Sequence, residues 1–177
     1  MAPLTCLRTA IVATLLAASA AALATQGPAI QVDFVHPENF SDLGDRYVSS
    51  DRVRASYLAE LKKHIVKRAS HLLANGQSLA VLITNVDMAG DFEPWRAQLG
   101  NTRIVRDVYP PRIDLTFTLN DTNGALVKSG SRELRDLAFM SSAALYHDQP
   151  LRYEKRLLDR WLEQEVAPAV TAGAAAR

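Results

Sequence analysis

RIDLTFTLNDTNG, residues 112–124, carries the clearest structural signal in this chain. Apolar and polar side chains alternate along its first eight residues, the pattern of a strand with one face in a core and the other toward water or a partner. The apolar set is Ile113, Leu115, Phe117 and Leu119, and the polar set is Arg112, Asp114, Thr116 and Thr118. The Asn123-Gly124 pair then predicts a tight turn, because these residues tolerate the positive φ of hairpin turns. We therefore expect a β-hairpin in which residues 125–137 return as the partner strand.

Three further strands are expected on the N-terminal side of this hairpin. Residues 30–35, IQVDFV, alternate in the same way, and residues 79–87, LAVLITNVD, are apolar on both faces at their start, which suits a central strand. Residues 103–109 predict a short strand that Pro110 and Pro111 end.

Two amphipathic helices complete the pattern. Apolar residues recur every three to five positions from Val53 to Leu73, after a Ser-Ser-Asp start and before Asn75-Gly76. Residues 151–166 repeat the pattern and are limited by Pro168. On this second helix we expect Lys155 and Asp159 to form an ion pair on the exposed side.

These elements predict a single α+β domain over residues 25–168. The order is β-α-β-β-β-α, and both helices need an apolar partner. The economical packing places both on one face of a mostly antiparallel sheet. Residues 169–177 are alanine-rich and are expected to form a disordered tail.

Residues 1–24 are typical of a cleavable secretory signal peptide. One basic residue, Arg8, precedes an apolar stretch that ends in Ala22-Leu23-Ala24. Sixteen or so apolar residues are too few for a span, which needs about 20. We expect cleavage after Ala24, a periplasmic or secreted protein, and no stable membrane span afterwards.

The composition excludes several classes of protein. The 177 residues suit one domain, and 20 basic against 19 acidic residues give no field that would attract nucleic acid. The single cysteine, Cys6, leaves with the signal peptide, so disulfides, thiolate metal sites and a cysteine nucleophile are excluded from the mature chain. No phosphate-binding glycine loop is present, and we expect no cofactor.

The densest group of polar and aromatic residues lies between the second strand and the hairpin. It comprises Asp87, Asp91, Glu93, Trp95, Arg96, Arg106, Asp107, Tyr109 and Arg112. One interpretation is a binding surface, because loops on a sheet often hold binding residues and arginines and aromatics recognise anions and rings. The other is structural, with Arg–Asp pairs fixing a loop over buried Trp95 and Tyr109.

Catalytic and metal-binding alternatives have weaker support. Asp87 with Glu93 or Asp107 could serve a hydrolase of an envelope polymer, if the carboxyl groups lie about 5–10 Å apart across a cleft. Asp87, Asp91 and Glu93 could together stabilise the segment by binding calcium, but their spacing does not match the twelve-residue EF-hand pattern, and we assign no metal ligand. No serine-nucleophile motif is present, so we assign no catalytic residue.

Four stretches resemble a known family. They are DMAGDFEPW (87–95), RIVRDVYPPRID (103–114), LRDLAFM (134–140) and LRYEKRLLDRWL (151–162). Together they resemble the bacterial family numbered 3016 among domains of unknown function, over nearly all of residues 32–166. The resemblance implies an exported single domain of Gram-negative bacteria, without an assigned activity or ligand. We therefore expect a non-catalytic binding or interaction module whose partner is an envelope protein or a small ligand.

Overall fold

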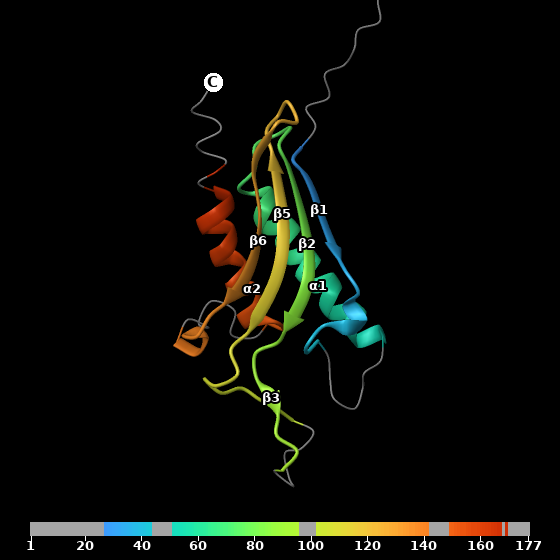
Figure 1. The fold of residues 1–177 in the computed structure, drawn as a ribbon, viewed down its shortest axis with the longest axis vertical. Coiled ribbons are helices and arrows are strands. Elements are labelled where there is room, and N and C mark those ends of the chain that lie inside the picture. Colours follow the sequence, from blue (N-terminus) through green and yellow to red (C-terminus); the bar gives the residue numbers. More distant parts are fainter. Residues whose placement is uncertain (1–26, 44–50, 96–101, 142–148, 168, 170–177) are drawn as a thin grey trace, which may run out of the picture.

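The computed structural model describes residues 27–43, 51–95, 102–141, 149–167 and 169 (Figure 1). The expected signal peptide, tail residues 170–177 and the candidate residue Arg96 lie outside this part of the chain. Among the described residues, no helix has the length and apolarity that a membrane span requires.

Four strands form the main sheet in the order β1-β2-β5-β6. Their bounds are β1 (Ala29–Phe34), β2 (Ser78–Asp87), β5 (Arg112–Asn120) and β6 (Leu126–Arg135). β1 runs parallel to β2, and the other neighbours are antiparallel. The parallel pair needs a crossover, which η1 (Pro37–Asn39) and the long helix α1 (Asp51–Ser70) provide.

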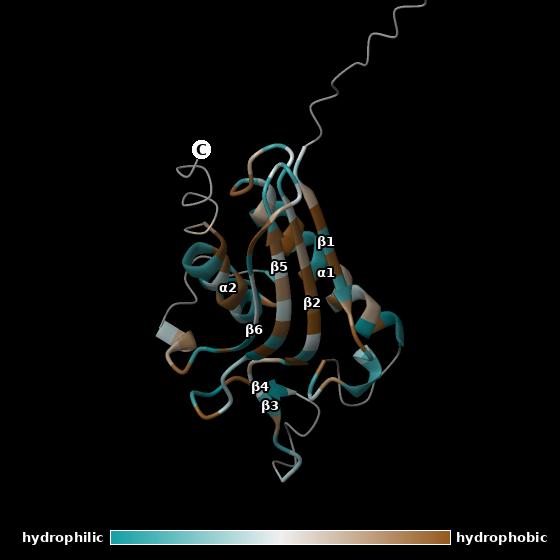
Figure 2. Ribbon diagram, turned by 45° about the horizontal axis from the view of Figure 1, so that its top comes forward, coloured by the Kyte–Doolittle hydropathy of each residue, from teal (hydrophilic) through white to brown (hydrophobic). Residues whose placement is uncertain are grey.

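Both helices lie on one face of this sheet (Figures 1 and 2). α2 (Arg152–Trp161) continues as a π-helical segment, η3 (Leu162–Val166), and Ala169 also packs against the core. The apolar residues of β5 are all buried beneath the helices, and the Phe117 ring meets the Trp161 ring edge to face at 5.5 Å. The structure therefore confirms an α+β fold with two helices on one face of a mostly antiparallel sheet.

A second, two-stranded sheet projects from one end of the main sheet. It pairs β3 (Asp91–Phe92) with β4 (Arg103–Ile104). The strand expected over residues 103–109 is therefore only two residues long, because the chain turns back where the Tyr109 amide donates to the Arg106 carbonyl at 3.0 Å.

The prediction of an exposed ion pair between Lys155 and Asp159 on α2 is wrong. Lys155 and Asp159 are both buried, and each bonds to α1 instead. The Lys155 ammonium donates to the Glu60 carboxylate at 2.7 Å, and Asp159 binds His64 and Arg68 at 2.8 and 2.9 Å. The polar side of α2 is thus a helix–helix interface. Helical periodicity identifies an apolar stripe but cannot show what covers the opposite side.

Candidate functional site at one end of the sheet

The candidate residues gather at one end of the main sheet. Asp87, Arg112 and Arg135 lie opposite one another in the strand register, so three neighbouring strands end in the same row. The described residues 88–95, 102–111 and 136–141 therefore leave the sheet together, as Figure 1 shows. We call residues 88–95 and 102–111 the arm; it contains β3 and β4.

Arg103 fixes the base of the arm. Its guanidinium donates to both carboxylate oxygens of Asp42 at 2.7 and 2.8 Å and to the Gly90 carbonyl at 2.9 Å. Gly90 has a φ of 84°, and a Cβ at this position would lie 2.8 Å from the Ile104 carbonyl oxygen. Only glycine fits this approach without a backbone shift, so the chain at the base is closely constrained.

A second arginine pair lies within the arm. Glu93 is fully buried and accepts from the Arg106 guanidinium at 2.9 Å and from the Tyr109 hydroxyl at 3.4 Å. The hydrogen bond to Glu93 raises the pKa of Arg106. The three residues that the sequence grouped as candidates are thus brought together, but they bind one another. Their role within the arm is to hold its shape.

Trp95 is the aromatic candidate residue that is exposed. Its side chain is 70% exposed, which differs from the buried tryptophan expected if the segment were only structural. Three further exposed apolar residues lie in the segments that leave the same sheet end, namely Val108, Leu137 and Met140. The segments that leave this sheet end therefore expose one aromatic and three aliphatic side chains, and exposed aromatic and apolar side chains are associated with binding surfaces.

The remaining candidates line the junction between arm and sheet. Arg112 donates two hydrogen bonds to Asp114, both at 3.0 Å, and these raise its pKa. Partial burial, and next the Asp42 charge, raise the pKa of the Asp87 carboxyl. Asp91 and Asp107 are exposed. Among the described residues, no group of histidine and acidic side chains is arranged to hold a metal ion.

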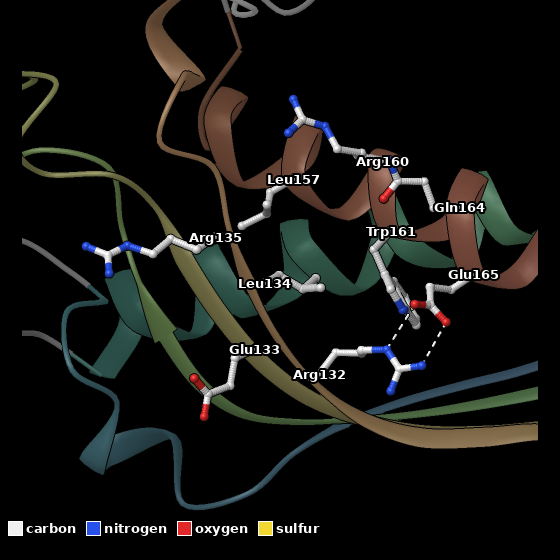
Figure 3. Close-up of a pocket in the computed structure, with 9 residues that line it drawn as sticks. All are labelled: Arg132, Glu133, Leu134, Arg135, Leu157, Arg160, Trp161, Gln164 and Glu165. Carbon is white, nitrogen blue, oxygen red and sulfur yellow. Dashed lines mark hydrogen bonds and ion pairs between the residues drawn. The ribbon is translucent and has the colours of Figure 1, made fainter.

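The structure also contains a groove that sequence reasoning did not find. It lies between β6 and α2 and has a volume of 160 Å³ (Figure 3). Its lining residues are Arg132, Glu133, Leu134, Arg135, Leu157, Arg160, Trp161, Gln164 and Glu165. The available signal was the spacing of Leu157, Arg160, Trp161 and Gln164, which places them on one helix face. Nothing in that spacing indicates a strand edge beside the helix.

Glu165 closes one end of the groove by binding β6. Its carboxylate accepts from the Arg132 guanidinium at 3.0 and 2.9 Å and forms an ion pair with Lys128 at 2.8 Å. Hydrogen bonds from Arg132 and then Lys128 lower the pKa of Glu165 to about 2. The pair joins the last turn of the helical segment to the edge strand.

This lowered pKa predicts a pH-dependent contribution to stability. A carboxyl with a folded-state pKa near 2, below its ordinary value of 4.5, stabilises the fold above pH 4.5. That contribution disappears as the pH falls from about 4.5 to about 2. The advantage of the native protein over Glu165→Gln in free energy of unfolding should shrink across this window, as measured by urea titration at several pH values. The control is Glu163→Gln, whose carboxyl is exposed; a difference between native protein and Glu165→Gln that stays constant from pH 6 to pH 2.5 would contradict the prediction.

Similarity to known proteins is found in the sequence and, weakly, in the fold. Residues 28–164 match the family described as "Protein of unknown function (DUF3016)". No curated protein matches the sequence. Among solved structures, a PelC dodecamer from Paraburkholderia phytofirmans is similar at 15% identity and a TM-score of 0.30, over 82% of this chain and 92% of that chain. A TM-score this low does not establish a common fold.

Proposed function

We propose that this chain, which belongs to the DUF3016 family of proteins of unknown function, is an exported, non-catalytic binding or protein-interaction module of the cell envelope. The binding surface is the sheet end that carries the arm. The observation behind this proposal is the 70% exposure of Trp95 on an arm whose base and interior are fixed by ion pairs. Large aromatic side chains contribute much of the energy at protein interfaces, and a loop ordered in advance loses less entropy on binding.

The charges of the sheet end support binding through shape and apolar contact. Arg103 faces Asp42, Arg106 faces Glu93, and Arg112 faces Asp114. These arginines are occupied by carboxylates of the same chain, so they position the arm more than they offer a site for an anionic ligand. Among the described residues, Trp95, Val108, Leu137 and Met140 are the large apolar side chains that this sheet end exposes to a partner.

A hydrolase built on Asp87 with Glu93 or Asp107 gains no support from this geometry. Glu93 is fully buried against Arg106, so a polymer chain would reach its carboxyl only after the arm had rearranged. The binding role therefore stands as the proposed function.

Export is part of the same proposal. Residues 1–24 have the composition of a secretory signal, and the mature chain would begin at Thr25. N-terminal sequencing of the protein recovered from the periplasmic fraction tests this directly. Recovery of the intact N-terminus in the cytoplasmic fraction would contradict export.

The binding surface predicts a position-dependent crosslink in cells. A photo-crosslinking residue placed at position 95 should yield a specific adduct with a partner. A second pair of chains carries the probe at position 108, with either Trp95 or Trp95→Ala. The substitution should reduce the amount of adduct about tenfold, the expected effect of losing an aromatic side chain from an interface.

The matched control is a probe at position 126, because Leu126 is also exposed and apolar but lies in the hairpin at the opposite end of the sheet. Equal adducts from positions 95 and 126 would show that the sheet end is not the binding surface. Melting temperatures of the variants, measured in parallel, separate lost binding from lost folding.

A further inference from the structure

β6 is an edge strand with its backbone accessible from the groove. Among the described strands it pairs with β5 alone, so alternate N–H and C=O groups face away from the sheet. The groove is lined by four consecutive β6 residues, Arg132 to Arg135. Side chains alternate between the two faces of a strand, so a groove that touches four consecutive residues follows the edge of the backbone.

The other wall of the groove is formed by α2 and η3. Leu157, Arg160 and Trp161 of α2 and Gln164 of η3 line this wall, and Leu157 and Trp161 point toward β6 (Figure 3). A strand edge beside a helix face suits an extended peptide. The edge supplies main-chain hydrogen bonds, and the space between strand and helix accepts side chains.

The size and lining of the groove indicate what it holds. Its volume of 160 Å³ is below the roughly 300–1,000 Å³ of sites for drug-sized molecules, and close to the approximately 150 Å³ that accommodates one benzene ring. Leu134, Leu157 and Trp161 supply apolar surface. The Trp161 indole N–H is buried and has no hydrogen-bond partner in the described part of the chain. One apolar side chain fits this space.

One cation beside the groove, Arg135, is available to an acidic side chain of a partner. Three of its lining residues are arginines and two are glutamates. Arg132 binds Glu165, and Arg160 binds Asp136 at 2.9 Å. Arg135 is exposed and makes no ion pair within the described residues, and its guanidinium extends away from the other labelled side chains (Figure 3). It is the cation available to a ligand.

We propose that the groove between β6 and α2 binds an extended peptide segment of a partner protein. The segment adds to the sheet as a strand beside β6, places one apolar side chain over Leu134, Leu157 and Trp161, and sets an acidic side chain beside Arg135. This inference goes beyond the proposed function, because it concerns a surface separate from the arm and from Trp95.

The test uses a phage-displayed library of random dodecapeptides, selected on the purified chain with Trp95→Phe. In this variant Trp161 is the one remaining tryptophan and reports on the groove by fluorescence. We expect enriched peptides that share an apolar residue followed by an acidic one. A synthetic copy should change the Trp161 emission and slow hydrogen exchange of those amides among residues 132–135 that face away from β5. Arg135→Glu should weaken its binding about tenfold.

A pair of helix variants completes the test. Gln164→Phe fills the groove from an exposed position and should weaken peptide binding at least tenfold. Glu163→Phe is the matched control, because Glu163 is also exposed but does not line the groove. Circular dichroism checks that both variants fold. The proposal fails if no peptide is enriched, if the selected peptides bind Gln164→Phe and Glu163→Phe equally, or if the amides of β6 gain no protection.

Discussion

Replacement of Trp161 by alanine is expected to lower the free energy of unfolding by about 3–5 kcal/mol, the usual cost of truncating a buried aromatic residue. Trp161 is only 2% exposed and joins α2 to the sheet through its edge-to-face contact with Phe117. Its removal leaves a cavity between the helix and β5. Because the ring is held between rigid elements, the surrounding side chains can fill that cavity only in part.

The chain provides its own control for this prediction. Trp95→Ala removes the same side chain from an exposed position, and we expect a change within about 0.5 kcal/mol. Urea unfolding monitored by circular dichroism measures both variants without depending on tryptophan fluorescence. Similar losses for the two variants would mean that Trp95 packs against the protein or that Trp161 does not.

Replacement of Asp159 by alanine is expected to cost about 3 kcal/mol. The Asp159 carboxylate is buried between the two helices, where it binds His64 and Arg68 at 2.8 and 2.9 Å. The substitution removes a partner from the buried His64 ring and one of the two carboxylates that bind Arg68. Loss of the partner of a buried polar group costs about 1–3 kcal/mol, and more where a charged group is involved.

Glu163→Ala is the matched control, because Glu163 also binds Arg68, at 3.0 Å, but is 60% exposed in its side chain against 7% for Asp159. Exposed ion pairs contribute between zero and about 1 kcal/mol, so a small effect is expected. Thermal and urea unfolding of both variants measure the difference. If Asp159→Ala and Glu163→Ala lose equal stability, the helix interface does not depend on the buried carboxylate.

The strands and helices could be predicted from local patterns of residues. Alternation along residues 112–119 fixes which side chains of β5 enter the core, and the structure buries Ile113, Leu115, Phe117 and Leu119 as expected. The Asn-Gly pair marks the turn, and helical periodicity marks α1 and α2. These signals are local because the faces of a strand or a helix repeat every two or 3.6 residues, so residues a few positions apart define them.

The candidate site was predicted only in part. Clustering in the sequence placed Glu93, Trp95, Arg106 and Tyr109 in one segment, and the structure brings three of them into contact. Nothing in the sequence distinguishes the buried Glu93 from the exposed Trp95. No local pattern identifies Asp42, because its contact with Arg103 joins residues 61 positions apart.

By itself, the sequence determined the four strands of the main sheet, the two helices and the apolar face of each one. Only the tertiary structure decided what lies against the polar faces. It buries Lys155 and Asp159 against α1, and it sets the edge of β6 beside α2 to form a groove. The physical reason is that periodicity depends on neighbours a few residues apart, whereas burial of a polar side chain depends on partners from distant parts of the chain that cancel its desolvation.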